Sequence, residues 1–221
     1  MLPPSSERID TDLLEYGEVT GDWSDREVFV IGAGPSLEGF DFSVLDGYTI
    51  GANKSAIVAN TDAMFSMDWK FAVEFHDQIV EYGKPFYFAV MTKHETQLKH
   101  NAIFLKSSRE GSLSSNPKTI IGLNSGYGAL NIAALKGAKK IGLLGFDMKL
   151  GTHKHFHGGY PWDRSKGASY NAWARRFKFA KTRIDELGLD VTNYIGPQGS
   201  GLEPYFKNRS LRDLDPNYPQ G

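Results

Sequence analysis

The segment "HKHFHGGYPWD", residues 153–163, holds three of the six histidines of the chain: His153, His155 and His157. In extended backbone this alternation would place all three rings on one side. A histidine titrates near neutral pH, so it can take a proton from an acceptor hydroxyl or neutralise a departing phosphate. Three histidines without a nearby Cys or Glu form a weak zinc signature, and an exposed structural segment remains the alternative. We predict acid–base work by His155 or His157, with Tyr160 supplying a hydrogen bond.

A second set of candidates follows the apolar run in "VFVIGAGPSLEGFDFSVL", residues 28–45. A dinucleotide-binding loop needs a third glycine where this chain has Leu37, and Pro35 fixes the backbone just before it. Gly32 and Gly34 can still let backbone amides approach a phosphate, and Ser36 can turn its hydroxyl to a ligand or to an orphan N–H. A glycine turn that merely ends a buried strand is the alternative reading.

The residues Asn124, Ser125, Gly126 and Tyr127 precede a run of small residues that predicts a helix. Asn124 is a good N-cap, and capping alone would explain it. If this helix start faces the glycine loop across a sheet, the two N-termini would form an anion site.

Polar residues also end three predicted strands: Asn53, Asp68 and Asp147. Ligands of open α/β sheets bind at the carboxyl ends of the strands. A carboxylate there can hold a ribose hydroxyl or, through water, a divalent metal such as Mg²⁺. Aspartate at a strand end is as often a turn former.

The elements that must position these residues alternate between strands and helices. Apolar runs predict strands over 27–34, 48–53, 63–69, 84–91, 139–148 and 189–196, and helical spacing predicts helices over 70–83, 129–135 and 169–187. Residues 119–150 form a βαβ unit. The polar, Ser-rich residues 94–118 predict a loop, whose 107–117 part would close over the site. The fold class is α/β: a Rossmann-like three-layer sandwich with a mainly parallel sheet in a single domain.

Composition limits the remaining possibilities. The 221 residues suit one domain over residues 26–206, between an N-terminal arm (1–25) and a C-terminal tail (207–221). The net charge of −1 argues against a large nucleic-acid footprint, and the absence of cysteine excludes disulfides and thiolate metal sites. Without a signal-peptide pattern or an apolar run of about 18 residues, we expect a cytoplasmic protein with no membrane segment. Homo-oligomerisation stays open.

Two ordered blocks carry a resemblance to a known family. "VFVIGAGPSLEGFDFSVL" with "YTIGANKS", and later "NSGYGALNIAALKGAKKIGLLGFDM", resemble the bacterial sialyltransferases of glycosyltransferase family 42. They also resemble the related domain family of flagellin-modifying motility-accessory proteins and 6-hydroxymethylpterin diphosphokinase. The segment "HFHGGYPW" looks closest to small phage-encoded members of unassigned role. The likeness covers about residues 27–60 and 119–206.

The resemblance implies a transferase with a nucleotide-activated donor, a nucleotide sugar. A glycan, a small molecule and a DNA base stay open as its acceptor. The family uses a tyrosine pair and a later histidine; the segment where that histidine is expected reads "SYNAWARR" here. Asp68 favours an alternative, an ATP- and Mg²⁺-dependent diphosphokinase, and a non-catalytic phage binding module is a third. The residues and the resemblance together give as candidate catalytic residues His155, His157, Tyr160 and Asp147, and as candidate donor-binding residues Gly32, Gly34, Pro35, Ser36, Asn53, Asp68, Asn124, Ser125, Gly126 and Tyr127.

Overall fold

The computed structural model describes residues 16–90, 102–109, 112–149, 155–158, 160 and 167–219. Its strands are β1 Val28–Ile31, β2 Tyr48–Ala52, β3 Ala63–Ser66, β4 Phe86–Val90, β5 Ala102–Ser108, β6 Thr119–Ile121, β7 Lys140–Leu144, β8 Asp190–Ile195 and β9 Lys207–Ser210. Its α-helices are α1 Lys54–Val58, α2 Trp69–Glu74, α3 His76–Tyr82, α4 Ser125–Leu135 and α5 Gly167–Glu186, and its 3₁₀ helices are η2 Pro35–Leu37, η3 Phe42–Val44 and η5 Leu211–Asp213.

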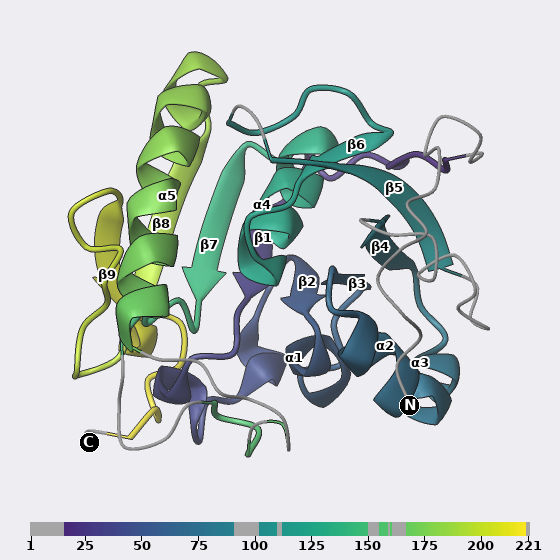
Figure 1. The fold of residues 1–221 in the computed structure, drawn as a ribbon. Coiled ribbons are helices and arrows are strands. Elements are labelled where there is room, and N and C mark those ends of the chain that lie inside the picture. Colours follow the sequence, from purple (N-terminus) through teal and green to yellow (C-terminus); the bar gives the residue numbers. More distant parts are fainter. Residues whose placement is uncertain are drawn as a thin grey trace.

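The described strands form one nine-stranded sheet in the order β6-β5-β4-β3-β2-β1-β7-β8-β9, and every neighbouring pair is parallel. The chain starts near the middle at β1, builds outward to the β6 edge, and returns to pair β7 with the other side of β1 (Figure 1). The gap between β1 and β7 is therefore the topological switch point, where open α/β sheets bind ligands.

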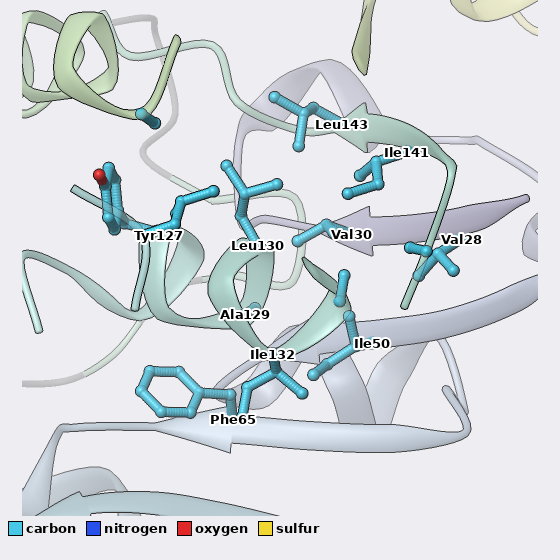
Figure 2. Close-up of a cluster of buried hydrophobic side chains, with 14 of the residues drawn as sticks. Val28, Val30, Ile50, Phe65, Tyr127, Ala129, Leu130, Ile132, Ile141 and Leu143 are labelled. Carbon is cyan, nitrogen blue, oxygen red and sulfur yellow. The ribbon is translucent and has the colours of Figure 1, made fainter. Parts of the chain in front are cut away.

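Side chains of β1 alternate between two hydrophobic clusters. Val28 and Val30 join α4 and α5 on one face of the sheet, whereas Phe29 and Ile31 join η2 and the C-terminal residues on the other. Figure 2 shows the first face, where Leu130 of α4 packs near the strands. A third cluster places α1, α2 and α3 against β3 and β4. Burial on both faces explains the continuous apolar runs, and the predicted three-layer Rossmann-like fold is confirmed.

Close packing fixes the distance between α4 and the sheet. A Cβ atom added at Gly128 would lie 2.1 Å from the Phe65 ring, and both residues are buried. Only a residue without a side chain fits at this helix position, so α4 lies directly on β3.

Two predicted elements were wrong. The helix expected over 70–83 is two helices, α2 and α3, which meet at Phe75 with φ −104° and ψ 21°. The segment 94–118, which we expected to be a loop, contains the seven-residue strand β5, Ala102–Ser108. The short apolar run at the start of β5 pairs with Phe86–Val90 of β4.

Both ends contribute to the domain where the structure describes them. In the segment expected as an arm, Trp23 is buried and stacks on Tyr48 with ring centroids 5.1 Å apart. In the segment expected as a tail, Lys207–Ser210 forms β9 beside β8, and Tyr218 is buried. None of the described helices is both long and apolar enough to cross a membrane.

Candidate functional site

A cavity of about 450 Å³ opens at the carboxyl ends of β1 and β7, and we call it the switch-point cavity. Eleven of the predicted site residues line it: Gly32, Gly34, Pro35, Asn53, Asp68, Asn124, Ser125, Gly126, Asp147, His155 and Tyr160. Ser36, Tyr127 and His157 are not in its lining. The structure thus brings residues from six separate segments to one place.

The first loop, residues 32–37, uses its amides inside the protein. Gly32 N–H donates to Leu144 O and Gly34 N–H to Gly145 O, both at 2.8 Å, and Ser36 N–H donates to Asp147 Oδ2 at 2.8 Å. These three amides are therefore not directed at a ligand, contrary to the expectation that the glycine loop presents them to a phosphate. The loop forms a wall of the cavity.

Close approach of β7 explains the second glycine of this loop. A Cβ atom at Gly34 would lie 2.6 Å from both Asp147 Oδ2 and Gly145 O. The glycine is needed because two turns pack against each other at the switch point.

Asp147 clasps the first loop. Its side chain accepts from Ser36 twice, from the amide and from Oγ at 2.5 Å, and only 8% of the residue is exposed. Burial raises the pKa of Asp147 above its usual value, although the Ser36 hydrogen bonds pull the pKa the other way. Both carboxylate oxygens of Asp147 thus accept hydrogen bonds from Ser36 and hold the first loop in place.

The N-terminus of α4 supplies donors that the first loop does not. Asn124 Oδ1 accepts from Tyr127 N–H at 2.9 Å, so Asn124 is the N-cap. Ser125 and Gly126 form the first turn of an 11-residue helix and line the cavity, where their amides have no carbonyl partner earlier in the helix. Tyr127 instead belongs to the buried hydrophobic cluster (Figure 2). Its ring meets that of Phe177 edge-on, with ring centroids 5.2 Å apart.

Two side-chain amides at the cavity have buried atoms without a hydrogen-bond partner among the described residues: Asn53 Oδ1 and Asn124 Nδ2. One is an acceptor and the other a donor, and an unpaired buried polar atom is costly unless a ligand or water meets it. Asn53 also has φ 55°, a left-handed conformation that is rare outside glycine. Met148, which also lines the cavity, has φ 48°. Such strain clusters at functional sites.

Asp68 is held by the start of α2. Its side chain accepts from Lys70 N–H at 3.0 Å and from Phe71 N–H at 3.3 Å, which is N-cap geometry. Among the described residues, no three His, Asp or Glu side chains gather as a metal site requires. The structure therefore offers no support for the expected Mg²⁺ role of Asp68.

The histidine segment forms an aromatic cluster beside the cavity. The rings of His155 and His157 stack with centroids 5.1 Å apart, and Tyr160 meets them edge-on at 5.4 Å and 5.2 Å. Tyr160 Oη accepts from Lys54 N–H at 3.2 Å, which ties the segment to the start of α1. His153 lies outside the described residues.

His157 is neutral near physiological pH. Its pKa is lowered to about 4, first by burial and then by the nearby His155 and Lys54. Since His155 lines the cavity and His157 does not, His155 is the histidine placed to meet a ligand.

The sequence analysis missed two aromatic residues of the cavity. Tyr170 and Trp173, on the first turns of α5, line it and meet edge-on at 5.3 Å. Trp173 lies four residues before the buried Phe177, and this helical spacing predicts a core residue. The signal that distinguishes it is its place near the helix start, at the carboxyl edge of the sheet.

The segment expected to close over the site lies elsewhere where it is described. Leu113 is buried in the core, Ser112 Oγ donates to Phe179 O of α5 at 2.6 Å, and Ser114 N–H donates to Asn131 Oδ1 of α4 at 3.0 Å. No described residue of 107–117 lines the cavity. The lid expectation was wrong for these residues.

Comparison with solved structures identifies proteins of similar architecture. The MAf glycosyltransferase from Magnetospirillum magneticum AMB-1 matches 89% of this chain with a TM-score of 0.62 and 12% identity. The sialyltransferase CstII from Campylobacter jejuni, solved with a substrate analogue, cytidine-5'-monophosphate, matches 89% of this chain with a TM-score of 0.53 and 15% identity. The match covers 92% of the CstII chain but only 36% of the MAf chain.

No protein-family model and no curated protein sequence matches the chain. At such low identity the two solved structures show the fold alone. The chain has the Rossmann-like fold of these two glycosyltransferases.

Proposed function

We propose that the protein is a transferase that binds a nucleotide-activated donor, a nucleotide sugar, in the switch-point cavity. The observation that carries this proposal is that the α4 N-terminus meets two buried side-chain atoms without a hydrogen-bond partner among the described residues, Asn53 Oδ1 and Asn124 Nδ2, at the switch point of a parallel sheet. A volume of about 450 Å³ suits a small-molecule ligand.

The donor phosphate would bind at the start of α4. The amides of Ser125 and Gly126 are hydrogen-bond donors, and the helix dipole favours a negative charge there. Asn53 Oδ1 and Asn124 Nδ2 would meet a donor and an acceptor group of the base or sugar. Trp173 offers a ring against which a base can stack.

In the proposed transfer step, His155 accepts the proton of the acceptor hydroxyl. The acceptor hydroxyl oxygen bonds to the anomeric carbon, the bond from that carbon to the phosphate oxygen breaks, and the nucleotide leaves with the electron pair. His155 takes the hydroxyl proton, as its place in the cavity lining allows. Tyr160 packs against His155 edge-on and positions it.

Isothermal titration with CMP, UDP, GDP, ADP and their sugar derivatives tests the proposal. One nucleotide series is expected to bind, and Asn124→Ala is expected to weaken its binding about tenfold, the usual cost of a lost polar contact to a charged ligand. Asn217→Ala, an exposed asparagine outside the cavity lining, is the matched control. A folded protein that binds none of these nucleotides would overturn the proposal.

Turnover separates the enzyme from the other two candidates. A transferase releases free nucleotide slowly from its donor by hydrolysis, and His155→Gln would reduce that rate while leaving donor affinity unchanged. Nucleotide binding without any release would favour the non-catalytic module. An activity that strictly requires Mg²⁺ and ATP, and that Asp68→Ala abolishes, would favour the diphosphokinase. Among the described residues, no group of three His, Asp or Glu side chains supports such a metal site.

A further inference from the structure

A second cavity, of about 470 Å³, lies at the carboxyl ends of β8 and β9. The loop after β8, the end of β9, η5 and the C-terminal residues form its walls. We call it the arginine cavity, because Arg209 and Arg212 line it. Among the described residues, none lines both cavities.

Basic side chains dominate this lining, and the acidic partner of Arg209, Asp213 at 3.2 Å, is not itself part of it. It contains two arginines and no aspartate or glutamate, in a chain whose net charge is −1. Its other polar groups include the Ser210 hydroxyl and the Asn208 amide. Such a lining attracts an anion and repels a cation.

Both guanidinium groups are anchored through Nε. Arg209 Nε donates to Asp213 Oδ2 at 3.2 Å, and Arg212 Nε donates to Tyr218 O at 3.1 Å. Ser210 Oγ accepts from Arg212 N–H at 3.2 Å, which fixes the turn that carries the second arginine. An anchored planar guanidinium loses little freedom when it meets an oxyanion, and it matches phosphate and carboxylate geometry.

The cavity is separated from the first loop by two residues. Tyr218 Oη donates to Ser36 O, and a Cβ atom at Gly196 would lie 3.0 Å from Ser36 Cβ and 3.1 Å from Tyr218 Oη. Tyr218 and Gly196 line the arginine cavity, so this wall is built from packed, hydrogen-bonded residues.

We propose that the arginine cavity is a binding site for a small oxyanion-bearing molecule, a phosphorylated or acidic sugar, held by Arg209 and Arg212. The volume exceeds that of a bare phosphate and fits a molecule of sugar size. This site is independent of the proposed donor site.

The test titrates the full chain with three probes: inorganic phosphate, a hexose 6-phosphate and glucuronate. Amide chemical shifts of Gly196 and Ser210, both in the lining, report binding at this cavity and distinguish it from binding at α4. We expect binding with a dissociation constant of about 1 mM or tighter. Comparison of the three probes shows whether the phosphate, the carboxylate or the sugar supplies the affinity.

The variant pair Arg209→Gln with Arg212→Gln is expected to weaken binding at least about tenfold, since each removes a charge-assisted contact. Both side chains are exposed, so the fold is expected to survive, as circular dichroism would check. Arg183→Gln, on α5 and outside both cavities, is the matched control and should bind normally. No shift at Gly196 and Ser210 with any probe at about 10 mM, or equal binding by the double variant, would overturn the proposal.

Discussion

Replacement of Ser36 by alanine removes the hydroxyl that donates to Asp147 Oδ1 at 2.5 Å. The carboxylate keeps the Ser36 amide as a donor at 2.8 Å, but it lies in a site where only 8% of the residue is exposed. A buried hydrogen bond to a charged group is worth about 1.5–3 kcal/mol. We therefore expect Ser36→Ala to lower the free energy of unfolding by about 2 kcal/mol once Asp147 is ionised.

The loss should depend on pH in a defined direction. Burial raises the pKa of Asp147 in the folded protein, so the folded state holds this proton to a higher pH than the unfolded chain, and ionisation costs stability as pH rises through the folded pKa. Loss of the Ser36 donor raises that pKa further. The deficit of Ser36→Ala is thus largest above the folded pKa of the variant, and it shrinks as pH falls through the folded pKa of the parent protein, because the unfolded pKa is common to both.

Urea unfolding followed by tryptophan fluorescence between about pH 4 and pH 8 measures this difference. Ser43→Ala is the matched control, because Ser43 Oγ donates to Asp41 Oδ1 at 2.6 Å in an exposed 3₁₀ turn, where no measurable loss is expected. An equal loss in both variants, or a loss in Ser36→Ala that does not change with pH, would refute the assignment of Asp147 as the clasp of the first loop.

Three further predictions concern packing, titration and recognition. Gly128→Ala should destabilise the protein by about 3 kcal/mol in urea unfolding, because the new Cβ would lie 2.1 Å from the Phe65 ring; a stable variant would contradict the packing of α4 on β3. Because the pKa of His157 falls to about 4, the unfolded chain binds this proton first, and stability should drop by up to about 3 kcal/mol as pH falls from about 6.5 to 4. This loss of stability should vanish in His157→Gln. If the loss persisted in that variant, another titrating group would be its cause. Trp173→Ala should weaken nucleotide binding about tenfold with an unchanged urea midpoint, whereas unchanged affinity would remove Trp173 from the donor site.

The sequence predicted the sheet well where apolar runs are continuous. β1 and β7 are buried on both faces, which leaves a run that periodicity recognises. β5 was missed because its residues are mostly half-buried and end in Lys106, Ser107 and Ser108. β9 was missed because all four of its residues are exposed, and only pairing with β8 makes it a strand.

The site was harder to predict than the fold. Strand ends and the helix N-cap pointed to the right place, because parallel strands end at one edge. The sequence does not show that the amides of Gly32 and Gly34 donate hydrogen bonds to Leu144 O and Gly145 O at the end of β7. These contacts join segments that lie more than a hundred residues apart in the chain. Trp173 has the helical spacing of a core residue, and only its position near the N-terminus of α5 brings it to the cavity.

The pairing of β1 with β7 has a consequence for folding. It pairs Val28 with Ile141, although the strands β2 to β6 all lie between these two residues in the sequence. Contacts of such long range form slowly, because the intervening chain must be ordered or closed into a loop first. The switch-point cavity forms only when the two halves of the sheet have joined, so binding of the proposed nucleotide would report this joining, and a fragment that ends before β7 would be unable to bind.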